Sequence, residues 1–267
     1  MTERARTTLH SAPPPAAFPG ATGLTVLDVY DWMAPDGLRG GSAHVHLAST
    51  EGYLVLSGEG QLQTLNAGGY AATPLRPGDC LWFTPGTIHR LVNDGDLRLA
   101  IVMQNAGLPE HGDAVLTFPP GILADPASYA SAASLPGAPG AQVAEAARRR
   151  AELAVEGYLA LRDQVASDGP AALDDFYAAA LRLTAGQVPD WRERWQAGAL
   201  ATAGLTGAHL DEIAAAVPGH LAAAGLWRIA APGAENGASG PAGPDSRGYG
   251  MCGRLTTYPA SRASRLL

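Results

Sequence analysis

The sequence predicts a mainly β protein, in which an antiparallel β-barrel is followed by a small α-helical module. From Thr22 to about Pro120, short runs of β-branched, aliphatic and aromatic residues are separated by Gly, Asn and Asp. From Ala141 to Ala230, apolar residues instead recur every three or four positions, which is the period of an amphipathic helix. Because several short strands at close spacing are typical of an antiparallel sandwich or barrel, the change of period separates two parts of the chain.

Composition divides the 267 residues into five segments. Residues 1–20 are rich in Pro and Ala without a continuous apolar stretch, which predicts a disordered leader rather than a signal peptide. Residues 21–136 form the predicted barrel, and residues 141–230 form the helical module. Residues 231–249 have almost nothing to bury and predict a flexible linker. The tail at 250–267 has two equal interpretations, a strand added to the barrel or a frayed end.

The elements follow from these periods. The strand segments read TVLDVY, SAHVHLA, GYLVLSGEGQLQTL, DCLWFTP, HRLVN and LRLAIVMQ. One long amphipathic helix has an apolar face made of Val143, Ala147, Ala151, Ala154, Tyr158, Leu161 and Val165, with Arg148 to Arg150 and Glu152 expected on its solvated side. Further helices are predicted around Leu173 to Leu181, around Trp191 and Trp195, and around Leu210, Ile213 and Val217 after Thr206.

The helical module has two possible roles. It is either a satellite bundle that stabilises the barrel, which we favour, or a structure over the barrel mouth that acts as a lid or as the interface of a homodimer. The segment from Leu205 to Trp227 also has a helix-turn-helix rhythm, but Arg228 is almost its only cation. A DNA-binding helix normally carries several cations, so this segment does not predict a nucleic-acid partner.

The charge and residue usage exclude several function classes. A formal charge of −7 argues against binding to nucleic acid or to an anionic membrane surface, and no apolar run approaches the roughly 20 residues of a spanning helix. All 18 basic residues are Arg, which excludes a lysine Schiff base and a P-loop lysine. Cys80 and Cys252 lack the spacing of a disulfide framework or a thiolate zinc site and predict reduced thiols in a cytoplasmic protein. The lysine-free, Ala-rich and Gly-rich usage suggests a GC-rich bacterial genome.

Three of the seven histidines, His44, His46 and His89, fall within one strand-rich stretch of fewer than fifty residues. His44 and His46 are two residues apart on one predicted strand, so both imidazoles point to the same face. Glu51 begins the next strand after a short turn, and His89 follows a Pro-Gly turn. Four such residues at consistent spacing predict a metal site. The other histidines, His10, His111, His209 and His220, have no further potential ligands at such spacing and are expected to be surface or structural residues.

These residues resemble the two sequence motifs of the cupin superfamily. The first motif reads His44-Val-His46, four residues, Glu51, six residues and Gly58; the second reads Gly78, ten residues, His89, three residues and Asn93. The family's opening glycine would fall at Leu38, with Gly37, Gly40 and Gly41 around it, and its proline is displaced by one to Pro85. The resemblance implies a cupin-type barrel, also called a jelly roll or double-stranded β-helix, with His44, His46, Glu51 and His89 as metal ligands.

Three neutral imidazoles and one carboxylate suit a divalent transition metal. Fe(II) is expected first, with Mn(II), Ni(II), Co(II) or Zn(II) as alternatives, because Ca²⁺ prefers oxygen ligands and Cu(I) prefers sulfur. Tyr53 and Val55 share the strand parity of Glu51 and, together with Trp82, are expected to line the substrate pocket. Arg90 should point away from it, which leaves the interior short of cations and disfavours a highly anionic substrate.

The function predicted from the sequence is that of a metal-dependent enzyme. The resemblance favours an oxygenase, dioxygenase-like in type, that acts on a small organic substrate with adjacent oxygen donors, such as an enol, a catechol or a 2-oxo acid. Glu51 is a metal ligand in this hypothesis and, if it leaves the metal, a candidate general base. The alternatives are a non-redox isomerase, epimerase, lyase or hydrolase that uses the metal as a Lewis acid, and a non-enzymatic module that binds a small molecule.

Overall fold

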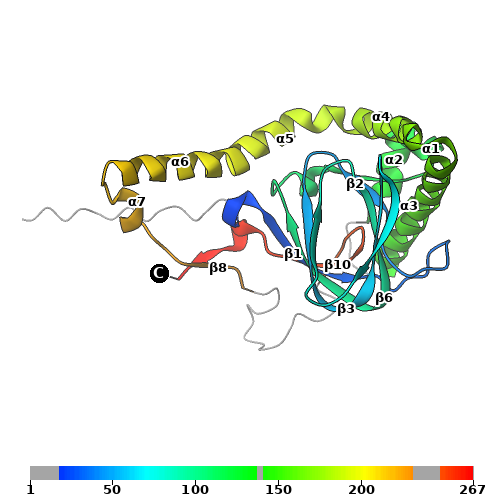
Figure 1. Ribbon diagram of the computed structural model, residues 1–267, viewed down its shortest axis with the longest axis horizontal. Coiled ribbons are helices and arrows are strands. Elements are labelled where there is room, and N and C mark those ends of the chain that lie inside the picture. The colour runs from blue at the N-terminus through cyan, green and yellow to red at the C-terminus, as the bar shows by residue number, and fades with distance from the viewer. Residues whose placement is uncertain (1–17, 137–140, 231–246, 267) are drawn as a thin grey trace, which may run out of the picture.

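A computed structural model describes residues 18–136, 141–230 and 247–266. In this part of the chain, nine antiparallel strands form a barrel-like sheet with helices packed against it (Figure 1). The structure therefore has the mainly β fold with an added helical module that the sequence predicts. Residues 1–17 of the proposed leader and residues 231–246 of the proposed linker lie outside the described residues. No helix of the described part is both long enough and apolar enough to span a bilayer.

The strands of the main sheet follow the order β4-β3-β6-β1-β10-β9, while β2 pairs with β6 and β7, and β5 pairs with β3. Their bounds are β1 Gly23–Val29, β2 His44–His46, β3 Glu51–Asn66, β4 Gly69–Leu75, β5 Cys80–Phe83, β6 Ile88–Met103, β7 Ala114–Leu116, β9 Gly248–Tyr249 and β10 Gly253–Thr257. A separate pair is formed by β8, Trp227–Arg228, and β11, Ser264–Arg265. The segment after the proposed linker thus adds β10 to the sheet, where it pairs with β1.

The long strands β3 and β6 pair over almost their whole length and bend together. Their register shifts three times between Val55 and Gly60, as expected where β-bulges turn a sheet into a closed shape. Gly58 stands at this bend with φ +76°, and a Cβ atom there would lie 2.2 Å from the carbonyl oxygen of Asp96. The glycine of the first motif is therefore needed because no side chain fits between the two strands.

Two hydrophobic cores lie on opposite faces of the sheet. The inner core fills the barrel and includes Leu27, Val29, Tyr53, Val55, Leu62, Leu75, Leu91, Leu97, Leu99 and Cys252. The outer core joins the sheet to the helices and includes Val45 of β2, Ile88 of β6 and Tyr158 of the long helix. The strand β2 contributes to both faces, because Val45 packs under the helices while the histidines on either side of it face the opposite way.

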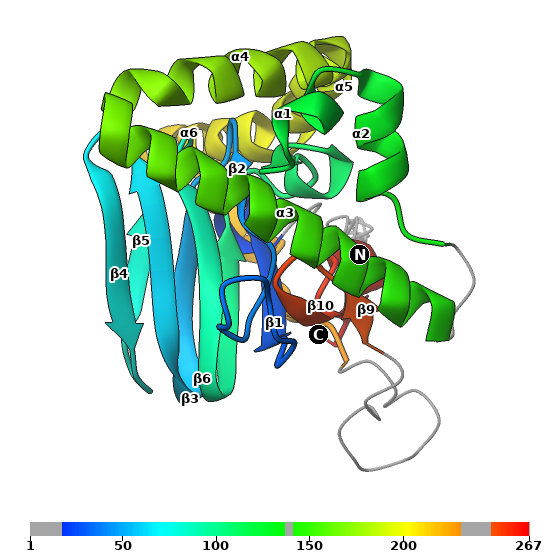
Figure 2. The same cartoon turned by 90° about the vertical axis from the view of Figure 1, so that its right-hand side faces the viewer.

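The helices cover one side of the barrel (Figure 2). They are α1 Pro120–Leu123, α2 Pro126–Ala133, α3 Ala141–Asp168, α4 Leu173–Thr184, α5 Val188–Trp195, α6 Ala201–Ala214 and α7 Gly219–Ala222. A π-helical segment, Gln196–Leu200, joins α5 to α6, and Figure 1 shows α6 reaching beyond the barrel. Helix α6 therefore begins earlier than the predicted start after Thr206, and α1 and α2 occupy residues that the sequence assigned to the barrel.

The long helix α3 packs closely on the outer face of the sheet. Every residue of its predicted apolar face is buried, and a Cβ atom at Gly157 would lie 2.0 Å from the carbonyl oxygen of Thr117. One expectation about this helix is wrong: Arg150 is buried, with 8% of its surface exposed, and does not lie on the solvated side. Continuing the helical period from Val143 and Ala147 already places position 150 on the buried face.

Candidate metal centre

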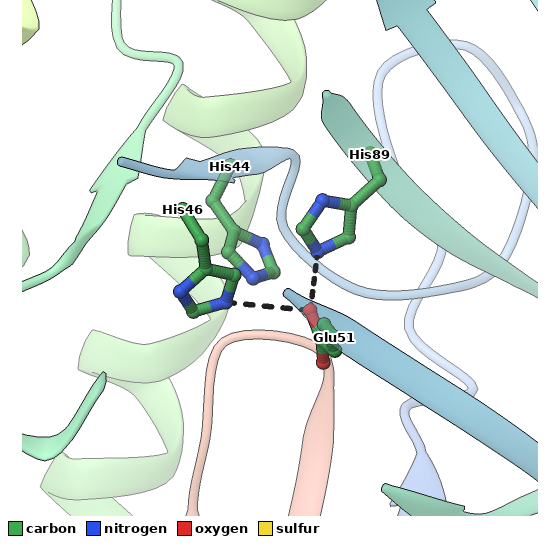
Figure 3. A group of neighbouring side chains, drawn as sticks. All are labelled: His44, His46, Glu51 and His89. Carbon is green, nitrogen blue, oxygen red and sulfur yellow. Dashed lines mark ion pairs between the residues drawn. The ribbon is translucent and has the colours of Figure 1, made fainter. Parts of the chain in front are cut away.

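The four predicted ligands come together inside the barrel (Figure 3). One ligand atom from each of His44, His46, Glu51 and His89 lies within 4.8 Å of the others, and all four residues are buried. The Oε2 atom of Glu51 is 3.3 Å from Nε2 of His46 and 3.1 Å from Nε2 of His89. These distances are short enough for one ion to contact all four side chains.

Three strands of the sheet position these side chains. The two histidines of β2 face inward on either side of Val45, and His44 is the register partner of His89 on β6. Glu51 is the first residue of β3 and pairs with Phe83 of β5. The ring of Phe83 lies 4.3 Å from the ring of His89, centre to centre, and packs against it. The ligands are therefore carried by hydrogen-bonded strands rather than by free loops.

The hydrogen bonds of the imidazole rings leave their Nε2 atoms available. Nδ1 of His44 lies 3.3 Å from the carbonyl oxygen of Ser42, and Nδ1 of His89 lies 3.0 Å from that of Thr87. Because a carbonyl oxygen only accepts, each Nδ1 must carry the hydrogen, and each Nε2 then carries a lone pair. This is the tautomer that a metal ligand requires.

The inner atoms of the cluster lack ordinary partners. Oε2 of Glu51 and Nε2 of His89 are both buried and, although close to each other, neither has a hydrogen bond of acceptable geometry. Buried polar atoms without partners are rare because they are costly. A cation between them would satisfy both atoms, so the residues present fit a bound divalent metal.

The protonation states agree with this interpretation. Burial, reinforced by the neighbouring histidines, holds the pKa of His44 well below its usual value. Burial acts to raise the pKa of Glu51, but His89 and His46 hold it well below its usual range, so the carboxyl group is ionised. Burial acts to lower the pKa of His46, yet the neighbouring carboxylates of Asp113 and Glu51 raise it to about 9. A metal that binds here must displace the proton from this ring.

Asp113 is a site residue that sequence reasoning missed. Its carboxylate is fully buried, and Oδ2 lies 3.3 Å from Nδ1 of His46. The other oxygen, Oδ1, accepts hydrogen bonds from the backbone N–H groups of Leu47 and Ala48 at 3.0 and 2.7 Å. A carboxylate that holds the outer nitrogen of a ligand histidine fixes the ring and strengthens the ligand. Asp113 follows a glycine in an irregular segment, and only the pairing of β7 with β2 places it beside His46.

A cavity of about 310 Å³ opens beside the cluster. Three of the ligands line it, together with Tyr53, Ile101, Met103, Leu255 and residues 249–252 of the C-terminal segment. Most of this lining is aliphatic or aromatic, as in many pockets for small organic molecules. The chain therefore places the candidate metal centre at the wall of an apolar cavity.

Of the three residues expected to line the pocket, only Tyr53 does so. Val55 is buried in the inner core beneath it and does not reach the cavity. Trp82 is 73% exposed and points outward, because its register partner Gly52 has the opposite parity to Glu51 and Tyr53. Neither Val55 nor Trp82 lines this cavity, and the aromatic residue of β5 that packs against a clustered histidine is Phe83.

The cavity also holds a cation that the sequence did not predict there. Arg150 of α3 lines it. The interior therefore contains a cation, contrary to the expectation from the sequence. Arg90 does point away from the cavity and instead forms a buried ion pair with Asp36, with an N–O distance of 2.5 Å. The error at Arg150 arises because its helix comes from outside the barrel and reaches the cavity only through packing.

The remaining histidines and cysteines lie apart from the ligands, with one exception. His111 is exposed, and His209 stacks on His220 in the outer helices, while His10 lies outside the described residues. Sγ of Cys252 is 3.9 Å from Nδ1 of His44, but burial and the Glu51 carboxylate raise the pKa of this thiol to about 12. Cys252 is thus a protonated core residue near the site, and Cys80 is exposed.

Solved structures that are similar to this chain share modest identity with it. They include a double-stranded β-helix protein of Klebsiella pneumoniae (22% identity, TM-score 0.26, 31% of this chain and 66% of the other). The Streptomyces nucleoside dehydratase Pac13 matches at 17% identity and TM-score 0.25 over 36% of this chain and 63% of the other. A predicted oxalate decarboxylase of Thermotoga maritima matches at 21% identity and TM-score 0.24 over 31% and 64%. In each case the match spans less than two thirds of the other chain.

The sequence comparison identifies one domain within the chain. No curated protein matches the chain. The family model described as a cupin domain matches residues 32–104, a segment that contains all four clustered ligands and both motif glycines. Together with the sheet and the buried cluster, this match identifies residues 32–104 as a cupin domain.

Proposed function

We propose that the protein is a metal-dependent enzyme, an oxygenase that acts on a small organic substrate with adjacent oxygen donors. The observation that carries the proposal is the buried cluster of His44, His46, Glu51 and His89 at the wall of a 310 Å³ cavity. A structural metal site is normally closed by its ligands, whereas a catalytic site keeps access for a substrate. The cavity supplies that access here.

The residues of the site have separable roles in this proposal. A divalent metal, when bound, would supply positions for the oxygen atoms of a substrate and, if it is Fe(II), redox chemistry. The three imidazoles and the Glu51 carboxylate would hold it, since Glu51 is ionised and the rings of His44 and His89 present free Nε2 atoms. Burial and the nearby Glu51 carboxylate raise the pKa of Tyr53 far above its usual value. Tyr53 therefore stays protonated and is able to donate a hydrogen bond inside the cavity.

Elemental analysis of protein purified without an affinity tag tests the first half of the proposal. Stoichiometric Fe, Mn or Ni supports the oxygenase, and the next measurement is oxygen consumption by the metal-loaded protein with enols, catechols and 2-oxo acids. The variant His46→Ala serves as the inactive control. Turnover of a substrate that continues at the same rate without oxygen would refute the oxygenase.

A second candidate function is Lewis-acid chemistry without oxygen, as in an isomerase, epimerase or lyase. The same donor set favours it, because three imidazoles and a carboxylate also suit Zn(II). Stoichiometric Zn together with anaerobic turnover would select this alternative. Absence of metal with a small molecule retained in the cavity would instead select a non-enzymatic binding module.

A further inference from the structure

Arg150 is a lining residue of the cavity beside the clustered ligands. It belongs to α3, outside the segment that matches the cupin family, and reaches the cavity because α3 packs across the barrel. More than nine tenths of its surface is buried, since only 8% is exposed. A fully charged side chain is rarely buried to this extent without a charged partner.

The hydrogen bonds of Arg150 leave its charge without a counter-ion among the described residues. One terminal nitrogen donates to the carbonyl oxygen of Gly250 at 2.6 Å, and the other donates to that of Ala133 at 3.2 Å. The Nε atom is buried and has no partner. Glu110, which also lines the cavity, accepts a hydrogen bond from the backbone N–H of Gly107 and forms no ion pair with Arg150.

This arrangement fixes the guanidinium without neutralising it. Two backbone carbonyls orient the planar group but carry no net charge, so a buried positive charge remains that a carboxylate would complement. The rest of the cavity lining is mostly apolar, apart from the metal ligands and Glu110. Such a cavity is complementary to a molecule with an apolar body and one anionic end.

The cation and the metal ligands belong to one cavity and are joined by a short segment of chain. Gly250, which accepts the hydrogen bond from Arg150, is two residues from Cys252, whose Sγ lies 3.9 Å from Nδ1 of His44. Both residues line the cavity together with His44, His46 and Glu51. A single small molecule therefore has access to Arg150 and to the metal ligands.

We infer that Arg150 is an anion-binding residue and that the substrate of this cavity is a small carboxylate with a largely apolar body. The inference deepens the proposed function and rests on it, since a carboxylate bound here is a substrate only if the protein is an enzyme. It also reverses the expectation from the sequence that an anionic substrate is disfavoured, because that expectation assumed that the barrel strands alone supply the lining.

Calorimetric titration of the full chain tests this inference. The probes are benzoate and phenylpyruvate, each compared with its methyl ester, which has a similar shape but no charge. We expect the wild-type protein to bind at least one acid about 10- to 100-fold more tightly than its ester. Arg150→Gln should abolish this preference, while Arg150→Lys should keep part of it because a point charge replaces the planar fork.

Arg149→Gln is the matched control, since Arg149 is the preceding residue of the same helix, is exposed and pairs with Glu145. It should keep the full preference. Equal binding of acids and esters by the wild-type protein, or a preference that survives in Arg150→Gln, would overturn the inference. If Arg150→Gln does not fold, the wild-type preference and its reduction in Arg150→Lys decide the question.

Titrations of both metal-free and Zn(II)-loaded protein separate this inference from the proposed function. An acid preference that persists without metal assigns the carboxylate to Arg150, even if the protein later proves to have no oxygenase activity. A preference seen only in the metal-loaded protein assigns the carboxylate to the metal. That result would reject the role of Arg150 and leave the proposed function intact.

Discussion

Each of the three clustered histidines has a polar partner at its outer nitrogen. His44 and His89 donate to backbone carbonyl oxygens, whereas His46 faces the buried carboxylate of Asp113. Backbone carbonyls are present whatever the side chains are, but the partner of His46 can be removed by substitution. The contributions of the metal ligands and of their support are therefore separable by mutation.

Loss of a ligand should affect metal occupancy more than any other change at this site. We expect His46→Ala or His89→Ala to lower metal affinity by more than the roughly 10- to 100-fold that loss of a supporting residue costs. His209→Ala removes a histidine that stacks on His220 far from the cluster in sequence and should leave occupancy unchanged. Metal content after dialysis against a fixed free-metal concentration measures this, and equal occupancy in the three variants would reject the site.

Asp113→Ala should weaken metal binding by about 10- to 100-fold, because His46 loses the carboxylate that orients it. Asp113→Asn should have a smaller effect, since an amide oxygen can still accept a hydrogen bond from the ring. The spectrum of the Co(II)-loaded protein reports the ligand geometry directly and should change in Asp113→Ala. Asp190→Asn is the control, because Asp190 forms an exposed ion pair with Arg194. Unchanged affinity and spectrum in Asp113→Ala would show that Asp113 has no positioning role.

At the level of elements, the paired strands β3 and β6 determine where the ligands stand. Both strands bend at the register shifts near Gly58, so Glu51 at the start of β3 and His89 near the start of β6 are brought to the same region of the barrel. The bend depends on the close approach of two backbones. The need for a glycine at this bend can be tested by comparing Gly58 with Gly78, because both have positive φ but only Gly58 is crowded.

Gly58→Ala should destabilise the protein much more than Gly78→Ala. At Gly78 nothing lies within 4 Å of an added Cβ atom, so only the left-handed backbone conformation is penalised, by about 1 kcal/mol. At Gly58 the same penalty is joined by a contact of 2.2 Å with the Asp96 carbonyl, so a loss of about 3 kcal/mol or more is expected. Urea denaturation followed by fluorescence measures both. Equal losses would mean that the crowding at Gly58 is relieved by small shifts.

The sequence predicts elements well where local periodicity decides them and poorly where packing does. The alternation of His44, Val45 and His46 and the apolar period of α3 are both present in the structure as expected. Trp82 faces outward because the register of β5 against β3 pairs it with Gly52. The sequence of the turn before β5 does not show which residues of that strand will face the interior. Arg150 was misplaced because the three consecutive arginines were assigned together to the solvated side, although the period set by Val143 and Ala147 places position 150 on the buried face.

At the level of the whole molecule, the cavity is assembled from three distant parts of the chain. The barrel supplies the clustered ligands, α3 supplies Arg150, and residues 249–252 supply a further part of the lining. Motif spacing identified the first part, because all its ligands lie within one continuous segment of the sequence. The other two parts carry no motif, and only the packing of α3 and the pairing of β10 with β1 bring them to the site.

Removal of the metal should lower the stability of the whole molecule, since the ligands come from three strands of the sheet. A metal present at about 100 times its dissociation constant stabilises the folded state by about 2.7 kcal/mol. For a chain of this size the melting temperature should then fall by several degrees on chelation. Differential scanning calorimetry with and without chelator checks this, and the His46→Ala variant should show no shift. A shift of equal size in that variant would point to a metal bound elsewhere.

The pairing of β10 with β1 joins the beginning and the end of the folded region. During synthesis on a ribosome, the four ligands emerge long before Tyr249 and Cys252, which complete the cavity wall. The nascent chain therefore presents an open ligand set for the time needed to translate the helices, and the wall is added last. The residues that could hold an ion are thus translated well before the residues that complete the wall of the cavity.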